Sequence, residues 1–158
     1  MVGTVRGVGL DVGTILGTEK GTLTRAMTTA QIADRLADRP TEAEIERDAY
    51  HLPISAIVAY LAEIAGVVVT GTIGNVATDR AVRHWIAGDR VPDHDPQLRF
   101  GYRIARMIES ACGSRAVQAW FKGSNTSLHD RAPALVLRDD FSEQTQHSIL
   151  GAARRIIQ

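Results

Sequence analysis

The chain has 158 residues, with 18 basic and 18 acidic side chains, so its formal net charge is zero. This length is enough to bury a hydrophobic core, whereas the balanced charge gives no general argument for binding a polyanion. Aromatic residues are few, and alanine, arginine and aspartate are frequent, a mixture that favours helices over strands. The single cysteine, Cys112, excludes an intramolecular disulfide and is typical of a reducing compartment.

The sequence also indicates a cytoplasmic protein without a membrane segment. It contains no run of 18 or more apolar residues, and about that many are needed for a helix to span a bilayer. The first residues lack the basic and then apolar pattern of a signal peptide. We therefore expect no membrane partner.

The N-terminal third predicts an arm followed by three helices. Residues 1–27 are rich in Gly and Thr and indicate a flexible arm. Thr29 is the expected cap of a first helix, and Thr41 is the expected cap of a second, acidic helix. Pro53 begins a third helix, which ends at Gly66.

The segment from Gly66 to Thr78 predicts a turn. The valines at 67–69 are β-branched, which suits a strand. Gly71 and Gly74 follow too closely for a strand to run on, and glycine is also a poor helix former. We therefore expect irregular backbone that leads into the next helix.

The rest of the chain predicts further helices, each with a recognisable start. Proline at the first position and a preceding Ser or Thr mark such starts. Without any strand pattern or internal repeat, the predicted fold class is all-α. The expected helices cover residues 80–87 (capped by Thr78 and Asp79, stopped by Gly88), Pro96 to about Cys112, Ser114 through Phe121, Pro133 to Leu137, and Ser142 onwards.

The helix over 80–87 has one apolar and one basic side. Residues three and four apart share a helix face, so its buried stripe is expected to comprise Val82, Trp85 and Ile86. Burial of the tryptophan would contribute about 2–3 kcal/mol and hold so short a helix in place. Arginine on such a helix can read guanine edges in the major groove. The candidate DNA-binding residues are Arg80, Arg83, His84 and, just beyond the helix, Arg90.

A second basic stripe lies on the following long helix. Arg99, Arg103 and Arg106 recur at spacings of four and three, which places them on one face. Such a stripe can contact phosphates, which position a protein without specifying sequence. It can equally pair with acids, of which residues 28–63 carry seven against three arginines. Both alternatives stay open.

Two spaced signatures resemble the Xre/MbcA/ParS type of antitoxin, over residues 54 to 158, about two thirds of the chain. The first is V-x-x-W-x-x-G-x-x-x-P, within the run VATDRAVRHWIAGDRVPDHDP. The second is W-x-x-x-x-N-x-x-L followed by P-x-x-V-L, within AVQAWFKGSNTSLHDRAPALVL. Their residues are Val82, Trp85, Gly88 and Pro92, and then Trp120, Asn125, Leu128, Pro133, Val136 and Leu137.

The resemblance implies a fold, a partner and a mechanism. It implies an Xre-like helix-turn-helix bundle over 28–112 and a small helical toxin-binding domain over 113–158, after the flexible arm at 1–27. It implies a RES-domain toxin that degrades NAD, whose active site the antitoxin occludes. It also implies self-association and repression of the protein's own operon, without a cofactor. The implied toxin-binding residues are Phe121, Asn125, Leu128, Arg154, Arg155, Ile157 and Gln158.

Two further expectations follow from individual residues. The glycine-containing segment before the basic helix falls where the first helix of the helix-turn-helix should lie, and its poor helix propensity weakens the case for DNA binding. Trp120 and Phe121 point about 100° apart on a helix. We expect Trp120 in the core and Phe121 shared between the core and an interface.

Rival functions are a stand-alone transcriptional regulator whose C-terminal part only dimerises, and a resolvase-like nuclease. The nuclease would use Asp11 in the run GLDVGT, but the hairpin that such a site requires does not follow, and a glycine-rich arm is the simpler interpretation. The histidines are scattered, and Asp93-His94-Asp95 lies between prolines as a polar turn. We expect no metal site and no enzyme.

Overall fold

The computed structural model of the chain describes residues 28, 30 and 39–158. Pro40–Gln158 forms one compact unit. The arm expected over residues 1–27 and the helix cap expected at Thr29 lie outside the described residues.

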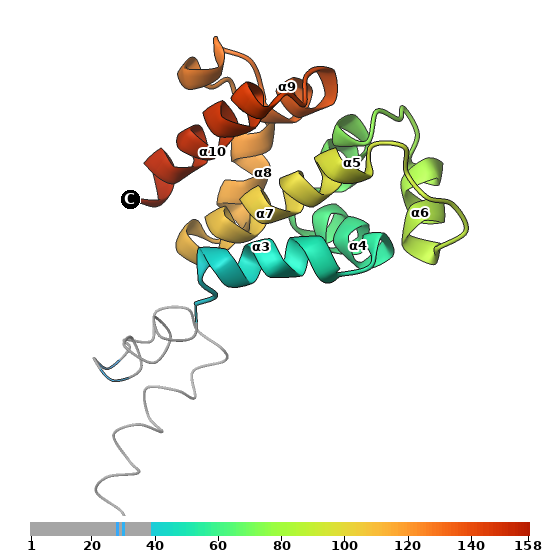
Figure 1. Cartoon of the computed structure of the whole chain (residues 1–158), viewed down its shortest axis with the longest axis horizontal. Helices are drawn as coiled ribbons and strands as arrows, with labels where there is room; N and C mark the ends of the chain where they lie inside the picture. Colours follow the sequence, from blue (N-terminus) through green and yellow to red (C-terminus); the bar gives the residue numbers. More distant parts are fainter. Residues whose placement is uncertain (1–27, 29, 31–38) are drawn as a thin grey trace, which may run out of the picture. The chain divides into compact units, whose positions relative to one another are not determined.

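Every regular element among the described residues is helical, which confirms the predicted all-α class (Figure 1). None of these helices is long and apolar enough to cross a membrane. The elements are α3 (Glu42–His51), α4 (Ile54–Ile64), α5 (Val67–Ile73), α6 (Asp79–Ala87), α7 (Asp95–Cys112), α8 (Ser114–Lys122), the short 3₁₀ helix η1 (Thr126–Leu128), α9 (Pro133–Asp139) and α10 (Glu143–Ile157).

Local capping chemistry sets several helix ends where the sequence places them. The Thr41 hydroxyl accepts a hydrogen bond from the Glu44 amide at 3.2 Å, and the Glu44 carboxylate accepts one from the Thr41 amide at 2.7 Å. This reciprocal pair is a capping box. Ser142 caps α10 by accepting from the Thr145 amide, and Gly88 ends α6 at a φ of +78°, a conformation that favours glycine.

Helix α5 corrects the turn expected between Gly66 and Thr78. The segment is helical from Val67 to Ile73, although its glycines oppose a helix on propensity alone. Both glycines lie where the backbone is closely approached by other groups. A Cβ at Gly71 would lie 3.3 Å from the Val76 carbonyl oxygen, and a Cβ at Gly74 would lie 2.5 Å from Cη2 of Trp85. Tertiary packing therefore overrides the local preference.

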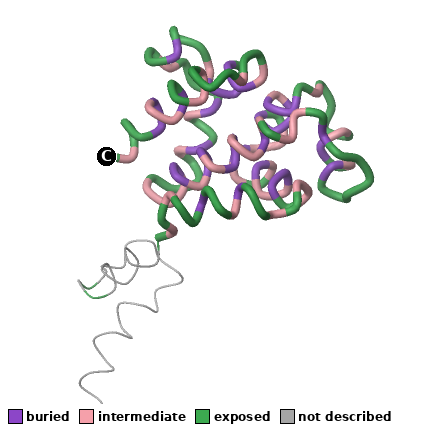
Figure 2. Tube along the Cα trace, viewed as in Figure 1, coloured by how far each residue is buried: buried purple, intermediate pink, exposed green. Residues whose placement is uncertain are grey.

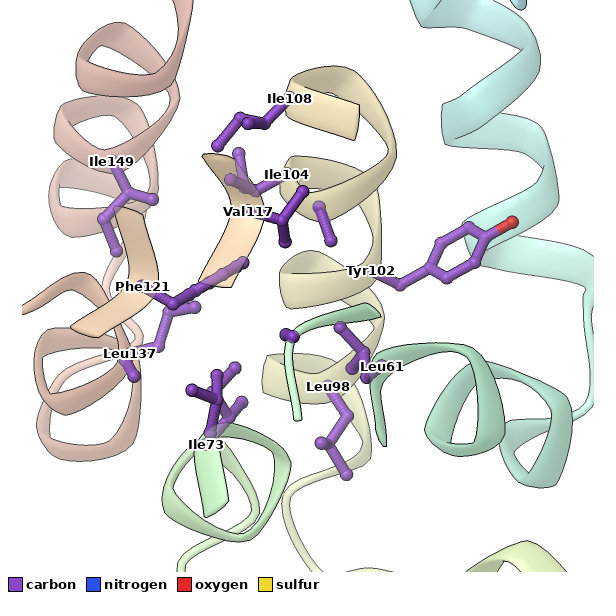
Figure 3. Close-up of a cluster of buried hydrophobic side chains, with 14 of the residues drawn as sticks. Leu61, Ile73, Leu98, Tyr102, Ile104, Ile108, Val117, Phe121, Leu137 and Ile149 are labelled. Atoms are coloured by element: carbon purple, nitrogen blue, oxygen red, sulfur yellow. The ribbon is translucent and has the colours of Figure 1, made fainter. Parts of the chain in front are cut away.

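Helix α7 runs through the hydrophobic core of the unit. Leu98, Ile104 and Ile108 of α7 are fully buried, and Figure 3 shows their side chains among those of the surrounding helices. The surrounding core residues include Leu61 of α4, Ile73 of α5, Val117 and Phe121 of α8, Leu137 of α9 and Ile149 of α10.

This core continues across the domain boundary expected between residues 112 and 113. Helix α8 begins at Ser114 and packs against α7, and α10 also packs against α7. The described helices on both sides of the expected boundary thus belong to the same compact unit. Figure 2 shows that buried and exposed residues alternate along these helices, as amphipathic helices around one core require.

The glycine at position 74 gives a direct test of this packing. We expect Gly74→Ala to lower the free energy of unfolding by about 1–3 kcal/mol, because the added methyl group overpacks against the indole of Trp85. Gly151→Ala, in α10, is the matched control because a Cβ there meets nothing within 4 Å. It should raise stability by about 0.5–1 kcal/mol through helix propensity. Urea unfolding followed by circular dichroism measures both, and equal effects would contradict the packing argument.

Candidate nucleic-acid interface

Helix α6 lies at one edge of the unit, and the end of α10 lies at another (Figure 1). Val82 and Trp85 hold α6 in place, since they are only 1% and 5% exposed and α6 packs against α4 and α5. Ile86 was expected in the same buried stripe, but it is 38% exposed. The buried side of α6 is thus narrower than expected and comprises Val82 and Trp85.

The expected arginines of this region are on the surface. Arg80, Arg83 and Arg90 are all exposed. Within the part of the chain that the structure describes, none of the three forms an ion pair. Their guanidinium groups are therefore available to an anionic partner.

His84 lies between one of these arginines and an aspartate. Arg80 Nε donates to His84 Nε2 at 3.4 Å, and His84 Nδ1 is 3.2 Å from Asp89 Oδ2. Sequence reasoning selected Arg80 and His84 but missed Asp89. A signal was present, because a left-handed C-cap glycine brings the following residue back against the last turn of its helix.

Acidic residues limit the positive charge of this surface. Asp79, Asp89 and Asp93 are exposed near the arginines, so the aspartates equal Arg80, Arg83 and Arg90 in number. Asp79 lies in the first turn of α6, where a negative charge stabilises the helix dipole. The surface thus offers separate exposed arginines and not a broad basic patch.

The arginines of the second basic stripe, on α7, interact with other groups of the same chain. Arg99 pairs with Asp95 at 2.5 Å and donates to the carbonyl oxygens of Ala49 and Leu52 at 2.9 and 2.7 Å. Those carbonyls lie at the C-terminal end of α3, where a cation satisfies otherwise unpaired acceptors. Arg99 therefore fixes α3 to α7.

Arg103 and Arg106 have internal partners as well. Arg103 binds Glu42 at 3.0 Å and Glu46 at 3.1 Å, both on α3. Arg106 pairs with Glu109 and lies over the ring of Tyr60, 5.5 Å from its centroid. Burial and the hydrogen bond to Glu109 raise the pKa of the Tyr60 hydroxyl. The structure thus favours pairing with acids over phosphate contact for this stripe.

Two of the expected toxin-binding residues are in the core. Phe121 is 0% and Leu128 is 4% exposed, so neither offers a contact surface in this structure. The expectation for Trp120 and Phe121 is reversed, because Phe121 faces the core and Trp120 is only partly buried. Asn125 has a local role, since its side chain caps η1 by accepting from the Ser127 amide at 3.0 Å.

The other expected toxin-binding residues lie together at the end of α10. Arg154 pairs with Glu42 at 2.5 Å, and Arg155 donates to the Ser127 hydroxyl. Both arginines are exposed, as is Gln158, whereas Ile157 is partly buried. Ile156, which the resemblance places with its neighbours in the toxin-covering final helix, is 43% exposed and adds an apolar side chain to this surface. The C-terminal surface is defined by Arg155, Ile156 and Gln158.

Across the described residues, no group of three or more His, Cys, Asp or Glu side chains is arranged to hold a metal ion. In the Asp93-His94-Asp95 turn, His94 Nδ1 lies 3.3 Å from the Ile73 carbonyl oxygen, and Asp95 is paired with Arg99.

Comparisons with protein-family models, curated proteins and solved structures found no match to this chain.

The ion pairs of Glu42 predict a defined acid sensitivity. Burial raises the pKa of Glu42, but hydrogen bonds from Arg154 and Arg103 and their charges outweigh this and lower it below 4.5. A lowered pKa in the folded chain stabilises it above pH 4.5, and this contribution disappears as the pH falls through the lowered pKa. We expect Glu42→Gln to cost at most about 1 kcal/mol at pH 7, since solvent screens the partly exposed pairs.

Urea unfolding at pH 7 and in acid measures this difference. Glu63→Gln is the matched control, because Glu63 is an exposed glutamate of α4 that forms no ion pair with any described residue. A cost of Glu42→Gln that persists unchanged in acid would contradict the assignment.

Proposed function

We propose that this protein is the antitoxin of a toxin–antitoxin pair, which binds operator DNA through α6 and a RES-domain toxin through its C-terminal surface. The observation that carries the proposal is the exposure of Arg80, Arg83 and Arg90 on and beside α6 without ion pairs to described residues. The resemblance of the two spaced signatures to Xre/MbcA/ParS antitoxins supplies the partner class.

The relation of α5 to α6 supports the DNA-binding half of the proposal. The two helices are in contact, and residues 74–78 form the turn between them. A helix-turn-helix uses its second helix for major-groove contacts, and α6 is that second helix. Gly71 and Gly74 do not prevent this arrangement, because α5 is helical and Gly74 allows Trp85 to approach α5 closely.

An arginine substitution on α6 tests DNA binding. We expect Arg83→Ala to weaken binding to the DNA upstream of the gene and to reduce the slope of log K against log salt by about 1, because one phosphate contact is lost. Fluorescence anisotropy over a salt series measures both quantities. Arg115→Ala is the matched control, since Arg115 is an exposed arginine of α8. Identical salt slopes for the two variants would contradict contact through α6.

The C-terminal surface supports the toxin-binding half by its exposure and composition. Ile156 is 43% exposed and has the exposed cation of Arg155 beside it in the chain. An apolar centre with an arginine is common at protein interfaces. Inhibition would be steric, by covering the mouth of the toxin's active site, and would need no cofactor.

A charge placed in this surface tests inhibition of the toxin. We expect Ile156→Asp to weaken binding to a RES-domain toxin encoded beside this gene by about tenfold or more, because the carboxylate is desolvated without a partner. The measurements are isothermal titration and NAD consumption by the toxin. Val68→Asp is the matched control, since Val68 is 67% exposed on α5. Full inhibition by Ile156→Asp would exclude this surface.

A stand-alone transcriptional regulator is the second candidate. It is favoured by the burial of Phe121 and Leu128, which removes two of the side chains expected to contact a toxin. Specific DNA binding, combined with failure of the intact chain to bind or inhibit the neighbouring toxin, would establish this alternative.

A further inference from the structure

We propose that His84, itself oriented by Asp89, positions the guanidinium group of Arg80 so that it reads a guanine in the major groove. This inference rests on the proposed DNA binding through α6 and assigns different roles to its two arginines. Arg80 specifies sequence, and Arg83, which has no comparable partner among the described residues, contacts phosphate.

The hydrogen bonds indicate which ring nitrogen of His84 donates and which accepts when the ring carries one hydrogen. Arg80 Nε carries a hydrogen and can only donate, so His84 Nε2, at 3.4 Å, must accept. The proton of the neutral ring then lies on Nδ1, which donates to Asp89 Oδ2 at 3.2 Å. Each donor thus faces an acceptor, and two successive hydrogen bonds connect Arg80 to His84 and His84 to Asp89.

Backbone geometry places Arg80, His84 and Asp89 next to one another in this order. Arg80 and His84 are four residues apart on α6, so they share a face. Gly88, at a φ of +78°, reverses the backbone after the helix, and the Asp89 amide donates to the His84 carbonyl oxygen at 3.0 Å. The turn that ends α6 therefore also holds the Asp89 carboxylate beside the imidazole.

This arrangement leaves the reading atoms of Arg80 free. His84 uses only Nε, so both terminal nitrogens of the guanidinium remain available for O6 and N7 of a guanine. A side chain that is already oriented loses less conformational entropy on binding, and this benefits the contact that demands a fixed geometry most. Non-specific attraction to phosphate gains little from orientation, because it depends on charge and not on direction.

The test separates discrimination from affinity. We measure binding of the full chain to its upstream DNA and to the same duplex with each candidate guanine replaced, over a salt series. We expect His84→Ala to lower the ratio of the two affinities about threefold to tenfold, with an unchanged salt slope because the arginines that contact phosphate are kept. His84→Gln should retain most of the discrimination, since its amide oxygen can accept from Arg80 and its amide group can donate to Asp89.

A double-mutant cycle shows whether His84 acts through Arg80. We expect the double variant His84→Ala, Arg80→Ala to discriminate no worse than Arg80→Ala alone, because the histidine then has nothing to position. Additive losses, or a His84→Ala variant with normal discrimination, would overturn the inference while leaving DNA binding intact. Failure of the unaltered chain to bind its upstream DNA would instead overturn the proposed function. Circular dichroism of each variant confirms that it is folded.

Discussion

The close approach of Trp85 to the backbone at Gly74 determines where α6 lies, and the candidate interface depends on it. A helix of 9 residues has little stability of its own in water. Burial of the indole supplies about 2–3 kcal/mol, whereas exposed polar contacts such as that of His84 with Asp89 contribute about 1 kcal/mol or less. Packing therefore places the helix, and the weaker polar contacts then orient single side chains on it.

The arginines of the chain fall into two groups, according to whether helix packing brings acidic partners to them. The arginines of α7 meet the acidic helix α3 and the carbonyl groups at its end, so they contribute to cohesion of the unit. The arginines of α6 form no ion pair with any described residue. A count of charges by segment cannot distinguish these two groups, because pairing depends on which helices become neighbours in space.

Helix ends that depend on nearby residues were predictable from the sequence, whereas features that depend on contacts between distant residues were not. The caps at Thr41 and Ser142 follow from side-chain hydrogen bonding within a few residues, and the cap at Gly88 follows from the backbone freedom of glycine; the structure confirms all three. Helix α5 was missed because its glycines matter through their contact with Trp85 and Val76, which no local rule contains. The toxin and the operator stay predictions that rest on the resemblance and on exposed side chains.

The two proposed surfaces differ in how they relate to the core. Helix α6 packs on α4 and α5, whereas α10 packs on α7, α9 and η1. The surfaces share no residue, so occupation of one does not by itself block the other at the level of side chains. Ile73 of α5 and Ile149 of α10 belong to the same core cluster. The proposed autorepressing complex requires a chain that holds a protein partner at one end while α6 stays available to DNA, and the separation of the two surfaces is compatible with this requirement.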